Sequence, residues 1–155
     1  MKPTSWYDTR NFRQVDDRLA TCGQPTEEQL ADARASGVDV VINLALHDDP
    51  RYSLPDERGT VEALGMSYVH IPVQFGAPTE SALLAFFDAM DSARERHVLV
   101  HCAANYRVTA FLGLYRCLRQ GWSRGEAFEL MGTVWKPDAV WTEFIDTMLA
   151  KHGGH

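Results

Sequence analysis

A cysteine stands where an apolar stretch of the sequence gives way to an amphipathic one. Cys102 follows residues 97–101, which predict a buried strand, and Arg107 stands at the start of a segment with helical spacing. In parallel α/β sheets, ligands bind beyond the carboxyl ends of the strands. The backbone N–H groups of a loop that enters a helix, together with the helix dipole, attract an anion there. The same field favours the thiolate form of Cys102, which is the nucleophilic form.

The residues after the cysteine can complete an anion-binding nucleophile loop. Arg107 offers a planar fork of donors that matches two oxygens of a phosphate or sulfate. The hydroxyl of Thr109 could donate to the sulfur or to a leaving thiolate. Backbone donors would come from Ala103, Ala104, Asn105, Tyr106, Arg107 and Val108.

Each of these residues also has an ordinary structural interpretation. Buried cysteines are mostly core residues, His101 could be a hydrogen-bonded interior histidine, and Arg107 a solvated residue at a helix start. The combination of strand, His-Cys, loop, arginine and threonine is rarer than its parts, and it favours the nucleophile loop. Cys117 lies on an apolar helix face and is predicted to be core. Cys22 ends a short strand and could approach the loop, although a structural role is favoured.

Composition limits the other functions that the chain could have. The 155 residues suffice for one domain, residues 1–155. The 15 Lys and Arg against 21 Asp and Glu give a formal charge of -6, which argues against nucleic acids and anionic membranes as partners. The sequence shows no signal peptide, membrane-spanning run, disulfide framework or histidine pair with metal spacing. We therefore expect a cytoplasmic protein with free thiols and no bound metal; the oligomeric state is not predicted.

Strand and helix signals alternate along the chain. Apolar runs predict strands at residues 18–21, 38–44, 67–73 and 97–101. Thr26 with Gln29 forms a capping box that opens a helix to Gly37. Further helices are predicted at residues 56–64, 81–93 and 123–131, after the cysteine loop up to Gly121, and from Trp141 to a stop at Gly153. This alternation predicts an α/β fold with a mainly parallel central sheet and helices on both faces.

The stretch HCAANYRVTAF resembles the signature loop of cysteine-dependent tyrosine and dual-specificity phosphatases. Four further stretches resemble, in the same order, a bacterial phosphatase-like family found fused in some proteins to β-lactamase-like hydrolases. They are NFRQVDDRLATCGQPTEEQL, VVINLAL, the PDE of LPDERGTVEALGMSYVHIPV, and APTESALLAFF. The resemblance spans roughly residues 11–148. It implies a phosphatase-like fold, a phosphocysteine intermediate, no metal or organic cofactor, and a phosphorylated small molecule or phosphoprotein as substrate.

The resemblance also implies roles for individual residues. Cys102 would be the nucleophile, and Arg107 would clamp the phosphate. His101 would orient the loop and help keep the cysteine ionised, while Thr109 would assist the sulfur. Residues 103–108 would supply the backbone donors.

Two features depart from the usual phosphatase pattern. Four residues separate Cys102 from Arg107 instead of five, with Asn105 at a glycine-like position where asparagine tolerates left-handed backbone. The segment IPVQFGAP carries Gln74 where tyrosine phosphatases usually carry an aspartate as general acid, whose loss costs about 10²–10⁴ in rate. Substitutes for that acid would come from the polar loop that includes Asp48, Asp49, Asp56 and Glu57, unless that loop is merely solvated.

These departures leave two alternatives to a phosphatase. Rhodanese-like sulfurtransferases resemble phosphatases in placing a cysteine at the centre of a ring of backbone N–H groups, and their loop commonly has the shorter length. They pass sulfur through a cysteine persulfide and need no general acid to protonate an alcohol leaving group. A pseudophosphatase that binds phosphate without catalysis would also tolerate a missing acid. The upstream segments favour the phosphatase over the first, and the retained Cys102 favours it over the second.

Overall fold

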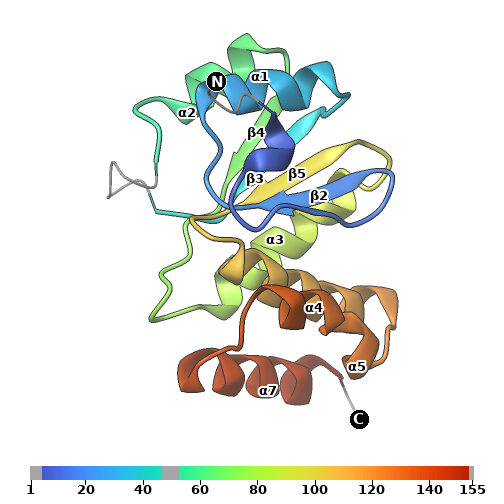
Figure 1. Ribbon diagram of the computed structural model, residues 1–155. Helices are drawn as coiled ribbons and strands as arrows, with labels where there is room; N and C mark the ends of the chain where they lie inside the picture. Colours follow the sequence, from blue (N-terminus) through green and yellow to red (C-terminus); the bar gives the residue numbers. More distant parts are fainter. Residues whose placement is uncertain (1–4, 47–52, 154–155) are drawn as a thin grey trace.

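The computed structural model describes residues 5–46 and 53–153. Within them, the chain forms a sheet in the order β1-β2-β5-β3-β4 (Figure 1). The strands β2, β5, β3 and β4 run parallel, and β1 pairs antiparallel with β2 at the edge. The bounds are Arg13–Gln14 for β1, Leu19–Cys22 for β2, Val40–Asn43 for β3, Ser67–His70 for β4 and Val98–His101 for β5. The mainly parallel sheet is confirmed, and the sequence did not predict the short edge strand β1.

Helices cover both faces of this sheet, as predicted (Figure 1). The helices α1 (Glu27–Ala35) and α2 (Glu57–Ala63) lie on one face, close to the short 3₁₀ helix η1 (Trp6–Asp8). The other face carries α3 (Glu80–Ser92), α4 (Tyr106–Gln120), α5 (Arg124–Ala127), α6 (Glu129–Val134) and α7 (Ala139–Gly153). In the described part of the chain, no helix combines the length and apolar character needed to cross a membrane.

The alternation of side chains along β5 divides the core in two. Leu99 packs with residues of α1 and α2, whereas Val98 and Val100 pack with residues of α3, α4 and α7. The side chains of Phe86, Phe111 and Trp141 are fully buried in the second cluster. Because β5 is central and covered on both faces, its carboxyl end is held firmly, and the loop with Cys102 begins at that end.

Local signals placed most helix ends correctly. Thr26 and Gln29 form the predicted capping box of α1, and Gly121 ends α4 with a φ of 74°. The single helix predicted over residues 123–131 is wrong, because the segment divides at Phe128 into α5 and α6. The Phe128 ring packs on Gly113 of α4, where an added Cβ would clash with the ring and force it to move. Tertiary packing on α4 therefore outweighs the local helical pattern.

Candidate active site

The cysteine loop lies at the carboxyl end of β5, where the sequence placed it. The N–H of Cys102 donates to the carbonyl of Cys22 at 3.3 Å, and the N–H of Gln24 donates to the carbonyl of Ala103 at 3.2 Å. The loop borders a cavity of about 250 Å³ lined by Phe75, Cys102, Ala103, Ala104, Tyr106 and Arg107. Cys102 has no exposed surface of its own and borders this cavity.

A left-handed residue turns the loop into helix α4. Asn105 has a φ of 69° and is fully buried at the position that precedes the helix. The first N–H groups of a helix have no partner within it, so those of Tyr106, Arg107 and Val108 are available to an anion. The expectation that asparagine supplies left-handed backbone here is confirmed.

Arg107 lies on the same cavity as the cysteine despite the shorter spacing. The residue is 8% exposed, and its Nη1 donates to the carbonyl of Val73 at 2.8 Å. Val73 belongs to the segment IPVQFGAP, which follows β4 and also supplies Phe75 to the cavity. The bond to Val73 engages one of the five guanidinium N–H donors and ties the group to the segment after β4. The arrangement is compatible with a phosphate clamp.

Thr109 is buried one turn into α4 and bonds away from the sulfur. Its hydroxyl lies 2.9 Å from the carbonyl of Asn105 and 3.0 Å from that of Tyr106, and it accepts a hydrogen bond from the indole of Trp135 at 3.1 Å. These contacts brace the start of the helix and the aromatic residue beside it. The role at the sulfur that the family resemblance implies for Thr109 stays a prediction.

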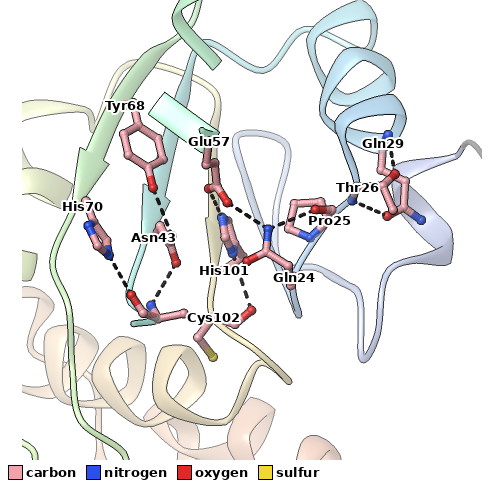
Figure 2. Close-up of polar contacts among 11 residues, drawn as sticks. Gln24, Pro25, Thr26, Gln29, Asn43, Glu57, Tyr68, His70, His101 and Cys102 are labelled. Atoms are coloured by element: carbon pink, nitrogen blue, oxygen red, sulfur yellow. Dashed lines mark hydrogen bonds and ion pairs between the residues drawn. The ribbon is translucent and has the colours of Figure 1, made fainter. Parts of the chain in front are cut away.

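A buried polar network supports the loop from the other side (Figure 2). The Nε2 of His101 lies 2.5 Å from Oε2 of Glu57, and both side chains are completely buried. Gln24 donates to the other carboxylate oxygen of Glu57 at 2.8 Å. The Nδ1 of His101 lies 3.5 Å from the carbonyl of Cys102. The sulfur of Cys102 points away from these polar side chains. His101 therefore lies directly behind the loop, and the orienting role that the resemblance implies for it stays a prediction.

The candidate general acids do not lie together in the structure. Glu57 is the partner of His101 and does not border the cavity, so it is placed to support the loop rather than to protonate a leaving group. Asp56 caps α2 by accepting from the N–H of Gly59. Asp48 and Asp49 lie outside the described residues. Among the described residues that line the cavity, none carries a carboxylate.

Aromatic side chains form one wall of the site, which the sequence did not predict. The rings of Tyr106 and Trp135 stack with centroids 4.8 Å apart, and Phe75 lies 5.6 Å from Trp135. The indole of Trp141 donates to the carbonyl of Phe75 at 2.7 Å, which anchors the segment after β4. Nothing in the sequence spacing connects Trp135 and Trp141 to Tyr106, so the sequence gives no signal for this contact.

The other cysteines differ from Cys102 in their surroundings. Cys22 is 1% exposed, and burial raises the pKa of its thiol to about 12. Burial also raises the pKa of the Cys117 thiol, which lies partly buried on α4. A larger cavity, of about 530 Å³, lies at the opposite end of the sheet, beside Leu19 and Val98 at the starts of their strands. It is separate from the cysteine loop.

The chain is similar to known phosphatases over most of its length. The family model described as "DSP-PTPase phosphatase fused to NAD+ Kinase" matches residues 4–138. A solved structure of a phosphatase candidate (DUF442) from Shewanella putrefaciens CN-32 is 35% identical, covers 94% of this chain and 95% of its own, and superposes with a TM-score of 0.82. The comparison with curated proteins found no match.

Two further structures share the fold. Tk-PTP in its active form is 26% identical over 94% of this chain and 97% of its own, with a TM-score of 0.73. A cysteine-to-serine form of P. aeruginosa TpbA, in complex with pTyr, is 18% identical over 94% of this chain and 91% of its own, with a TM-score of 0.69. The fusion partner in the family description is NAD+ kinase rather than the β-lactamase-like hydrolase of the sequence resemblance. The chain belongs to this DSP-PTPase family, and it is a phosphatase of the cysteine-dependent tyrosine and dual-specificity type.

Proposed function

We propose that the protein hydrolyses phosphate monoesters, with phosphotyrosine or similar aryl phosphates preferred, through a phosphocysteine at Cys102. One observation carries this proposal: Cys102 and Arg107 border the same small cavity, and Phe75 and Tyr106 border it beside them. A nucleophile, a planar donor fork and aromatic side chains meet at one point. Phosphate groups match the first two, and an aryl ring matches the third.

The chemistry follows from these positions. The thiolate of Cys102 attacks phosphorus in line, so that a sulfur–phosphorus bond forms as the bond to the leaving oxygen breaks. The N–H groups of the loop and the guanidinium of Arg107 stabilise the equatorial oxygens. The departing phenolate takes a proton from solvent. Water then attacks phosphorus, releasing phosphate and the Cys102 thiolate.

The lining of the cavity favours an aryl substrate over an alkyl one. An alkoxide is a poor leaving group and needs an acid, whereas a phenolate leaves with little help. No carboxylate lines the cavity in the described part of the chain, and Phe75 is 37% exposed, so that its ring can meet that of a substrate. The pTyr complex of TpbA, which shares this fold, is compatible with the same substrate class here.

A paired assay tests the proposal. Purified protein should hydrolyse 4-nitrophenyl phosphate and phosphotyrosine but should not transfer sulfur from thiosulfate to cyanide. Cys102→Ser should abolish hydrolysis, because a hydroxyl is almost never ionised at neutral pH without a dedicated base, and should keep oxyanion binding. Cys117→Ser, on the outer part of α4, is the matched control and should behave as wild type.

Other outcomes would replace the proposal. Sulfur transfer with a cyanide-cleavable persulfide, and no phosphate release, would establish the sulfurtransferase alternative. Binding of phosphotyrosine without turnover by wild-type protein would establish a pseudophosphatase.

A further inference from the structure

Two asparagines far apart in the sequence bond to each other across the cysteine loop. The Nδ2 of Asn11 donates to the carbonyl of Ala104 at 2.9 Å. The Nδ2 of Asn105 donates to the carbonyl of Asn11 at 2.8 Å, and also lies 2.9 Å from the hydroxyl of Thr21. Asn11 is partly buried in the segment before β1. It is the first residue of the stretch NFRQVDDRLATCGQPTEEQL, which resembles the phosphatase-like family, but the sequence assigned it no role.

Both asparagines have left-handed backbone, which a non-glycine residue adopts at a cost. The φ of Asn11 is 55°, and that of Asn105 is 69°. Such residues keep this conformation only when their surroundings hold them. Asn105 is the residue at which the loop becomes α4, so its conformation aims the first turn of the helix and with it Arg107. Asn11 provides part of the support for this turn.

The same contact controls where a loop carbonyl points. A carbonyl oxygen turned toward a bound anion would repel it, so the loop must face its carbonyls elsewhere. The Ala104 carbonyl is bonded to Asn11, and the Ala103 carbonyl to the N–H of Gln24. Neither Asn11 nor Gln24 lines the cavity. Because a peptide unit is planar, the N–H of Ala104 points away from Gln24 when the Ala103 carbonyl points toward it.

We propose that Asn11 is a positioning residue of the anion-binding loop, which it holds in the shape that receives the phosphate group. It acts through Ala104 and Asn105 and touches no substrate. The inference rests on the proposed function only in so far as the anion is the phosphate of a substrate. Binding of an inorganic oxyanion tests the role of Asn11 without turnover.

Two substitutions separate the side chain of Asn11 from its backbone. Asn11→Gly keeps the left-handed backbone without strain and removes the amide, because glycine adopts positive φ readily. Asn11→Asp keeps the shape but sets a carboxylate oxygen against the Ala104 carbonyl. Arg13→Ala is the matched control: it lies two residues away, and its guanidinium bonds to Thr133 of α6 rather than to the loop.

Three measurements on the full chain judge these variants. Tungstate affinity is measured by calorimetry, and thermal unfolding reports the fold. The third measurement is the midpoint pH at which the absorbance of the Cys102 thiolate appears, with Cys102→Ser, which lacks this absorbance, as the blank. We expect Asn11→Gly to bind tungstate about tenfold more weakly, which corresponds to one lost hydrogen bond. Asn11→Asp should lose more, and in both variants the midpoint should move to higher pH, because a misshapen loop stabilises the thiolate less. Arg13→Ala should match wild type in tungstate affinity and midpoint.

The outcomes distinguish this inference from the proposed function. If both Asn11 variants lower the unfolding temperature but keep wild-type tungstate affinity and midpoint, Asn11 is merely structural and the inference is wrong. If wild-type protein binds tungstate but releases no phosphate from aryl esters, the proposed function fails, and the affinities of the variants still decide the role of Asn11. Wild-type protein that binds no tungstate overturns both.

Discussion

The carboxylate of Glu57 lies 2.5 Å from the imidazole of His101, directly behind the loop that carries Cys102 (Figure 2). Both side chains are fully buried, and Gln24 donates to the second carboxylate oxygen. The carboxylate fixes the orientation of the imidazole ring, whose other nitrogen faces the carbonyl of Cys102. This pair connects α2 to the end of β5, so the position of Cys102 depends on a helix that lies far earlier in the chain.

Glu57→Ala should destabilise the protein strongly. Removing one partner of a buried pair leaves the other without compensation and typically costs about 3–5 kcal/mol. Urea unfolding followed by circular dichroism measures the loss. The control is Glu62→Ala, on the same helix, where the carboxylate lies 3.9 Å from Arg58 and both side chains are 57% exposed. That surface pair should contribute about 0.5 kcal/mol or less. Equal losses in the two variants would contradict the importance of the buried pair.

Arg107→Lys should impair turnover of aryl phosphates while the protein remains folded. A lysine ammonium is a point charge and cannot reproduce two parallel hydrogen bonds to phosphate oxygens. Removing a charge-stabilising donor of this kind commonly lowers kcat by about 10²–10³. Steady-state kinetics on 4-nitrophenyl phosphate provide the measurement, with Arg119→Lys, in an exposed pair with Asp91, as the control. Wild-type kcat in Arg107→Lys would show that backbone donors and the helix dipole suffice.

Iodoacetate should alkylate Cys102 before the other two cysteines. An anion-binding loop attracts the reagent and stabilises the reactive thiolate. Burial raises the pKa of Cys22 to about 12, so at pH 8 that group remains a thiol. A thiol with a raised pKa stays protonated until the pH approaches that pKa. Cys22 should therefore become reactive only in strongly alkaline solution or on unfolding. Peptide mass spectrometry after brief alkylation identifies the modified residue.

Tungstate provides the control for this alkylation experiment. An oxyanion in the loop should protect Cys102 and leave the slow reaction of Cys117 unchanged. Preferential labelling of Cys22 or Cys117 at pH 8 would show that the loop does not activate its cysteine.

The rate of hydrolysis should depend steeply on the leaving group. Because no carboxylate lines the cavity in the described residues, the leaving oxygen receives little help from an acid. Esters of acidic phenols should therefore react fastest, phenyl phosphate more slowly, and phosphoserine slowest. Measuring kcat/KM across a series of substituted phenyl phosphates gives the slope of log kcat/KM against the pKa of the leaving phenol. A flat dependence would reveal an acid, with Asp48 and Asp49 as the first residues to replace.

The sequence alone determined the features that depend on neighbouring residues. The strand Val98–His101, the loop after it and helix α4 form one continuous segment, so their order places Cys102 and Arg107 together by chain connectivity. The capping box at Thr26 is likewise local, because the backbone and side chains of adjacent residues decide it. The alternation of strands and helices indicated a mainly parallel sheet, because parallel strands are joined by helical crossovers.

Only the tertiary structure decided which distant residues complete the site. Asn11, Glu57 and Val73 come from three separate segments, and their contacts with the loop depend on how α2, β1 and the segment after β4 pack around the sheet. Glu57 shows the difference most clearly: from sequence it was one of four candidate acids in a polar loop, yet it is buried against His101. Patterns along the chain report local propensity and burial, whereas pairing between segments is decided by the packing of the whole fold.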